Sequence, residues 1–190
     1  MILQRLREQT LESHRRLEAR LDLLTMMLSL DRYRHLLARF YGFYLPVETH
    51  LETVCRNSNL ELQFPQRRKA HFLVQDLEAL GLTGPQVNAL PLCNTYPTLT
   101  LLPQALGCLY VLEGATLGGQ IISRHLQKVH GLHAENGAAF FSSYGSNVGA
   151  MWRAFGAAIL SYPSGPTEDA VIIRTACETF AALEGWLCDE

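Results

Sequence analysis

Apolar residues recur at helical spacing over most of the chain. Near the N-terminus they form a stripe of Leu6, Leu17, Leu21 and Leu24. No alternating apolar and polar run of useful length predicts a β-strand. The pattern therefore predicts an all-α, multi-helical bundle, with helices at about 2–22, 31–56, 66–81, 101–130, 147–161 and 167–187.

Capping and breaking residues set the expected ends of these helices. Asp31 is expected to cap the second helix, Pro46 to kink it, and Gly81 to end the third. Three stretches are expected to be irregular: 82–99, 132–146 and 163–166. No internal repeat or low-complexity segment is present in the 190 residues, so a single domain spanning 1–190 is expected.

The segment 110–126 has helical periodicity but carries glycine at positions 114, 118 and 119. Each interior glycine costs a helix roughly 1 kcal/mol relative to alanine, so Gly114, Gly118 and Gly119 together cost roughly 2 to 3 kcal/mol. Gly114 and Gly118 stand four positions apart and share one face. Either a neighbouring helix packs against this bare strip, or a flat ligand does.

A second candidate feature lies on the N-terminal helix, where His14 and Glu18 stand one turn apart. Such a pair is commonly a solvated ion pair on a helix surface. The alternative is that the imidazole binds a metal and the carboxylate orients it.

The two features together resemble the haem oxygenases, and most closely the bacterial type associated with bacteriophytochromes. The family's proximal helix carries T-x-x-x-H-x-x-x-E, matched by Thr10, His14 and Glu18. Its distal helix carries E-G-x-x-L-G-G-Q, which begins here at Glu113 and ends at Gln120. The stretches 140–145 and 152–155 also resemble family segments, so the likeness covers nearly the whole chain.

The resemblance implies a fold that holds haem between the N-terminal helix and the glycine-containing helix. It implies that His14 is the axial ligand of the iron, oriented by Glu18, and that Gly114, Gly118 and Gly119 let the distal helix lie over the porphyrin. Haem is then both substrate and cofactor, and it is opened by dioxygen and electrons to biliverdin, iron(II) and carbon monoxide. An acidic donor such as ferredoxin or flavodoxin is implied as the electron source, and a bilin-binding photoreceptor as a possible recipient of the product.

Further site residues follow from the resemblance at the mouth of the pocket. Arg7, Tyr110 and Arg153 match positions that bind the haem propionates, and Phe180 matches an aromatic that packs against the haem. For each arginine a solvated surface charge is an equally good interpretation, and Phe180 fits a simple core position as well.

The sequence departs from the animal enzymes beside the first glycine, where they carry an aspartate that anchors distal water. This chain has Ala115 there. Thr116 or a backbone carbonyl of the glycine strip is a candidate replacement.

Composition limits the alternatives. A net charge of −2 gives no indication of nucleic-acid binding. Arginines crowd the first forty residues, which fits either solvated helix faces or a basic rim that steers an acidic electron donor. Five scattered cysteines, no signal-like N-terminus and prolines that interrupt the uncharged stretch 79–112 indicate a cytoplasmic protein without a membrane span.

Three function classes remain open on these grounds. The first is a haem oxygenase that supplies bilin chromophore or releases iron. The second is a haem carrier or sensor of the same fold without turnover, which the alanine at position 115 brings into consideration. The third is another enzyme of the same helical fold, such as a thiamine-degrading one, which binds no haem.

Overall fold

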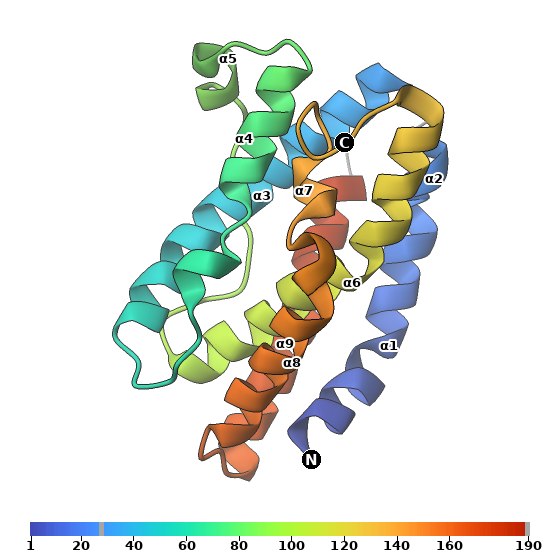
Figure 1. Cartoon of the computed structure of the whole chain (residues 1–190). Helices are drawn as coiled ribbons and strands as arrows, with labels where there is room; N and C mark the ends of the chain where they lie inside the picture. Colours follow the sequence, from blue (N-terminus) through green and yellow to red (C-terminus); the bar gives the residue numbers. More distant parts are fainter. Residues whose placement is uncertain (27–28, 189–190) are drawn as a thin grey trace.

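The computed structural model describes residues 1–26 and 29–188, and this part of the chain consists of helices and loops without a strand, as predicted (Figure 1). In chain order the elements are α1 (Ile2–Leu21), α2 (Leu23–Met26), α3 (Leu30–Arg56), the 3-10 helix η1 (Phe64–Arg67), α4 (Ala70–Ala79), α5 (Gly84–Asn88), α6 (Leu102–His130), α7 (Ala139–Ser142), the 3-10 helix η2 (Gly145–Asn147), α8 (Val148–Ser161) and α9 (Pro166–Cys188).

Several predicted boundaries are wrong by a few residues. The cap of α3 is Ser29 rather than Asp31, because the chain is already helical at Leu30; Asp31 lies in the first turn and accepts a hydrogen bond from Arg34 at 2.7 Å. α3 runs through Pro46 as one element. Gly81 follows α4 with a φ of +96°, the left-handed backbone expected after a helix end.

The stretches predicted to be irregular contain short helices. The first holds α5, where a capping box joins Thr83 and Gln86. The second holds α7 and η2. The carboxylate of Asp76 in α4 accepts the backbone N–H groups of Ala139 at 2.7 Å and Phe140 at 2.8 Å, which caps α7 from another helix. Four or five residues are too few to display a helical period, so the sequence pattern misses these elements.

Packing around α9 creates the site. α6 and α1 both pack along α9, while α3 packs mainly on α4 and also contacts α6 and α9. Close approach of α6 to α9 depends on Gly107, where a Cβ atom would collide with the carbonyl of Ile172. Because α1 and α6 share one partner helix, they face each other across the space between them (Figure 1).

α6 also has the length and composition of a membrane span, with a mean hydropathy of 1.3 in its most apolar window. Half of that window is buried inside the protein, which is typical of a core helix. The burial agrees with the interpretation of α6 as part of the core.

Candidate functional site

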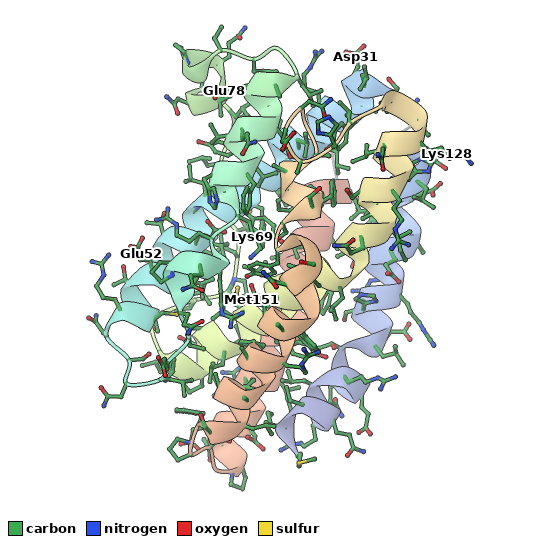
Figure 2. The ribbon with its side chains drawn as sticks, viewed as in Figure 1. Asp31, Glu52, Lys69, Glu78, Lys128 and Met151 are labelled. Atoms are coloured by element: carbon green, nitrogen blue, oxygen red, sulfur yellow. The ribbon has the colours of Figure 1, made fainter. Side chains whose placement is uncertain are left out.

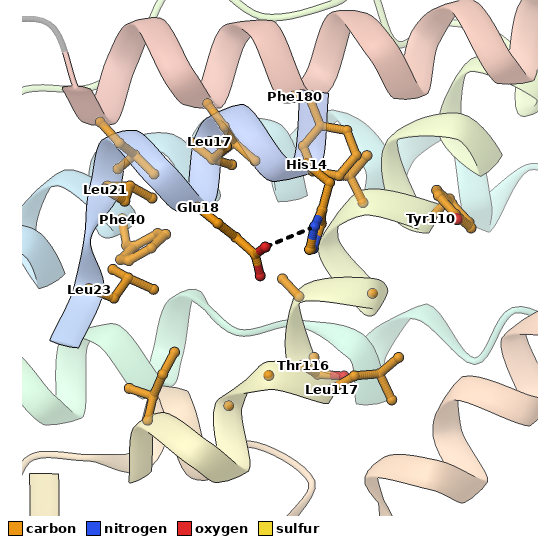
Figure 3. A pocket seen from close by; sticks show the side chains of 18 of the residues that line it. His14, Leu17, Glu18, Leu21, Leu23, Phe40, Tyr110, Thr116, Leu117 and Phe180 are labelled. Carbon is orange, nitrogen blue, oxygen red and sulfur yellow. Dashed lines mark ion pairs between the residues drawn. The ribbon is translucent and has the colours of Figure 1, made fainter. Parts of the chain in front are cut away.

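A cavity of about 720 Å³ lies between α1 and α6 (Figure 3). It is large enough for a drug-sized or larger flat ligand. Its lining is mostly apolar, with a few polar side chains. The lining residues are Arg7, Thr10, Leu11, His14, Leu17, Glu18, Leu21, Leu23, Phe40, Tyr44, Lys69, Tyr110, Val111, Gly114, Ala115, Thr116, Leu117, Gly118, Gly119, Ile122, Phe140, Phe141, Trp152, Phe180, Leu183 and Leu187.

α1 supplies the imidazole wall. Leu6 and Leu21 are buried, while the His14 side chain is 50% exposed and lines the cavity. His14 Nδ1 lies 3.3 Å from Oε2 of Glu18, and Figure 3 shows both side chains in the space below α1. The ring also meets Phe180 edge-on, with centroids 5.7 Å apart. Because the Nδ1 edge is occupied by Glu18, Nε2 is the nitrogen that remains for a ligand in the cavity.

The sequence leaves two explanations for the glycines of α6, close packing of a neighbouring helix and space for a flat ligand, and the structure supports each of them at different glycines. A Cβ atom built on Gly118 meets nothing within 4 Å, and one on Gly114 meets only the Trp152 ring at 3.9 Å. A Cβ atom on Gly119 would instead collide with the carbonyl oxygen of Phe141. Gly119 therefore permits the close packing of α7, whereas Gly114 and Gly118 leave a bare helix face beside the cavity.

The residues next to the first glycine offer little to a ligand. Ala115 lines the cavity with a methyl group. Thr116 also lines it, but its hydroxyl donates to the backbone carbonyl of Glu113 at 2.7 Å. The hydrogen of that hydroxyl is thus already used within the helix.

Glu113 has a structural partner that the sequence does not indicate. Its side chain is 1% exposed and pairs with the guanidinium of Arg67, which is also 1% exposed. Tyr144 donates to the same carboxylate at 2.8 Å, and Lys69 lies 3.3 Å from it. Breaking such a buried pair by removing one partner costs about 3–5 kcal/mol, so the glutamate of the glycine motif ties α6 to η1 and to the segment after α7.

The predicted propionate partners do not all reach the cavity. Arg7 and Tyr110 line it. Burial raises the pKa of Tyr110, and the neighbouring Thr10 hydroxyl and Arg7 charge offset only part of that rise. Arg153 is exposed and is absent from the lining; its guanidinium lies back along α8, 3.3 Å from where a Cβ atom on Gly149 would be. A propionate role for Arg153 needs a movement of this side chain.

The cavity also contains residues that no motif in the sequence indicates. Trp152 of α8 stands 5.7 Å from Tyr110, centroid to centroid, and covers the region beside Gly114. Tyr44, Lys69 and Phe140 reach the cavity from α3, the start of α4 and α7. They come from elements far apart in the chain, so only the folded arrangement brings them together.

Comparison with known proteins agrees with this geometry. A family model described as heme oxygenase matches residues 1–189. The chain belongs to the haem oxygenase family. Curated protein sequences gave no match. The family assignment removes the thiamine-degrading class from consideration.

Solved haem oxygenases share the fold of this family member. The haem oxygenase of Leptospira interrogans matches with a TM-score of 0.80 and 21% identity over 100% of this chain and 99% of that one. The NO- and CO-bound enzyme of Neisseria meningitidis matches with a TM-score of 0.81 and 22% identity over 98% and 90% of the two chains. A haem complex from the cyanobacterium Synechocystis gives 0.77 and 19% over 98% and 90%. At these identities the likeness shows the all-α haem oxygenase fold.

Proposed function

We propose that this protein is a haem oxygenase that opens haem to biliverdin, iron(II) and carbon monoxide. One observation carries the proposal: an imidazole on α1 and a bare glycine face on α6 border the same cavity. A flat macrocycle with a metal at its centre needs both an axial nitrogen and room for its faces.

The residues present fit haem. His14 would hold the iron through Nε2, and Glu18 would fix the ring by accepting a hydrogen bond from Nδ1–H. Gly118 leaves space where any side chain would stand in the cavity. At the mouth, Arg7 and Tyr110 would meet the carboxylates that a porphyrin carries, since unpaired carboxylates at a low-dielectric cleft are costly.

When bound, haem supplies the iron that binds dioxygen and the carbon that is oxidised. The protein would contribute orientation: the apolar lining would limit the water around the macrocycle, and the bare face of α6 would let the helix backbone lie close to it. The side chain of Trp152 beside Gly114 narrows the cavity at one end.

A haem carrier or sensor is the second candidate, and the alanine at position 115 favours it. Without a carboxylate there, protons must come from water held by other groups. Turnover separates the two candidates, since a carrier keeps its haem intact under reductant and air.

The finer expectations concern partners. We propose an acidic ferredoxin or flavodoxin as the donor, a cytoplasmic location, and a bacteriophytochrome or iron release as the destination of the products. Part of the arginine set already has intramolecular partners: Arg16 and Arg20 pair with Glu184, at 2.7 and 3.0 Å. Arg15, exposed on the same helix, is a better candidate for donor docking.

The test is a hemin titration of the purified protein followed by ferredoxin, its reductase and NADPH in air. The expected result is a one-to-one Soret complex that bleaches to biliverdin, identified by chromatography. Absence of a complex contradicts the haem site, and a complex that survives reduction in air supports the carrier instead.

A further inference from the structure

α1 is well buried only in its first half and at its last residue. Its buried residues are Ile2, Leu6, Thr10 and Leu21. Between the last two lie residues 11–20, all of which the structure describes, and we call this stretch the His14 segment. Ser13 and Leu17 are half-buried there, and the other eight residues are exposed. Figure 2 shows α1 along one edge of the molecule, with many of its side chains projecting outward.

Apolar burial therefore contributes little to holding the His14 segment. The cavity runs along one side of the segment, since His14, Leu17 and Glu18 all line it. The main packing partner of α1 is α9. Towards α9 the ring of His14 meets Phe180 edge-on, with centroids 5.7 Å apart. One ring contact and a half-buried leucine bury little apolar area, so other contacts must fix the position of this segment.

Ion pairs with α9 supply such contacts. Glu184 Oε2 lies 2.7 Å from Nε of Arg16, and Glu184 Oε1 lies 3.0 Å from Nη1 of Arg20. Each carboxylate oxygen thus accepts a hydrogen bond from a different guanidinium, one before Glu18 in the chain and one after it. The side chain of Glu184 is only 10% exposed. It attracts these cations more strongly than a fully solvated carboxylate would, because less solvent screens its charge.

Glu184 is itself held in place. The neighbouring Leu183 is buried, and Trp186 donates its indole N–H to the carbonyl of Arg39 on α3 at 2.7 Å. The guanidinium of Arg39 also lies over the Trp186 ring, 4.1 Å from its centroid. Hydrogen bonds from the two guanidiniums of α1 lower the pKa of Glu184, so its carboxylate is ionised at neutral pH. A fixed, charged group of α9 therefore contacts the part of α1 that carries the proposed axial ligand.

A second ion pair joins the same two helices away from His14. Nη1 of Arg5 lies 2.7 Å from Oδ2 of Asp169, near the start of α9. Here too a half-exposed arginine meets a largely buried carboxylate, with exposed fractions of 47% and 18%. Around Arg5, however, the buried side chains of Ile2 and Leu6 also hold α1. The two contacts thus differ mainly in how much apolar burial accompanies them.

We propose that Glu184 is the positioning residue for the axial histidine, holding the His14 segment against α9 through Arg16 and Arg20. The inference rests on the haem binding proposed above. A bond from Nε2 to the iron requires the imidazole to stand at a fixed height over the macrocycle. Glu18 orients the ring but belongs to the same helix, so it cannot set the position of that helix. Glu184 belongs to another helix and sets it.

Amide hydrogen exchange of the haem-free protein tests the contact itself. Glu184→Gln keeps the size of the side chain and removes its charge. We expect exchange in residues 11–20 to become about fivefold faster, the size of two partly exposed ion pairs, with little change in residues 2–9. Asp169→Asn is the matched control and should leave the exchange of residues 11–20 unchanged. Equal exchange in Glu184→Gln and the wild type contradicts the proposal.

The haem complex tests whether Glu184 acts through His14. Hemin should dissociate about fivefold faster from Glu184→Gln than from the wild type, and the iron–imidazole stretching band of the ferrous complex should broaden. In a His14→Ala background, Glu184→Gln should change the hemin dissociation rate by less than about twofold, because the residue through which it acts is gone. Asp169→Asn should match the wild type in both the rate and the band.

Equal acceleration by Glu184→Gln in the two backgrounds would mean that Glu184 supports the cavity as a whole, and the proposal would be wrong. If Glu184→Gln does not fold, the double variant Arg16→Gln with Arg20→Gln removes the same contacts from their exposed side, and the same results are expected of it. A wild-type protein that forms no hemin complex contradicts the proposed function. The exchange of the haem-free protein then still decides whether Glu184 holds the His14 segment.

Discussion

The neighbouring glycines of α6 offer a matched pair of substitutions with opposite expected effects. At Gly118 an added methyl group meets nothing within 4 Å, so Gly118→Ala should gain the helix-propensity term of about 1 kcal/mol. For a chain of this size that gain corresponds to a rise in Tm of about 2–4 °C. The measurement is thermal unfolding of the haem-free protein.

At Gly119 the same methyl group would collide with the carbonyl oxygen of Phe141. A backbone carbonyl cannot rotate aside as a flexible side chain does, so α7 must shift. Overpacking of this kind costs about 1–3 kcal/mol, which at least offsets the gain in helix propensity. We expect Gly119→Ala to be destabilised by a net ~0–2 kcal/mol and its Tm to fall by up to about 8 °C.

For haem binding we expect Gly118 to be the sensitive position and Gly119 the tolerant one, the opposite of their effects on stability. Gly118→Leu should fold, because leucine favours helix, yet its side chain stands in the cavity and should abolish hemin binding and ring opening. Gly119→Ala, if folded at low temperature, should still bind hemin. Equal Tm changes of the same sign in the two alanine variants, or unchanged hemin affinity in Gly118→Leu, would refute this division of the glycines.

Three further predictions concern other parts of the site and fold. His14→Ala should keep hemin in the cavity but lose the histidine-ligated spectrum and biliverdin formation; turnover without added imidazole contradicts the ligand assignment. Hemin titration should show about tenfold weaker binding for Arg7→Glu and less than a twofold change for Arg153→Glu. Burial raises the pKa of Asp76 to about 6, above its value in the unfolded chain. As the pH rises from about 4 to 7, the free energy of unfolding of the wild type should therefore fall by about 1–3 kcal/mol relative to that of Asp76→Asn, measured by urea unfolding. Parallel pH profiles of the two proteins contradict this.

The long helices could be predicted because each repeats its apolar pattern over several turns. α6 and α9 are examples, with 29 and 23 residues. α7, with four residues, has no such repeat and exists because Asp76, more than sixty positions earlier, caps it. The sequence does not identify Ser29 rather than Asp31 as the cap of α3, because both residue types are good caps and the local sequence does not decide between them.

The site divides along the same line. His14, Glu18 and Gly118 lie on two helices whose motifs span only a few turns, and the fold brings them to one cavity. Tyr44 and Lys69 depend on how α3 and the start of α4 pack on α6, which no local pattern encodes. The two functions of adjacent glycines in α6 also depend on a neighbour, the carbonyl of Phe141, that the sequence does not reveal.

The packing of α1 along α9 has a consequence for how the protein acquires its ligand in the cell. The cavity is lined by Arg7 and His14 near one end of the chain and by Leu183 and Leu187 near the other. During synthesis on the ribosome, α1 therefore cannot pack against α9 until α9 has been synthesised and has left the exit tunnel. Haem capture then requires that α9 has emerged, and nascent chains arrested before α9 should not retain hemin.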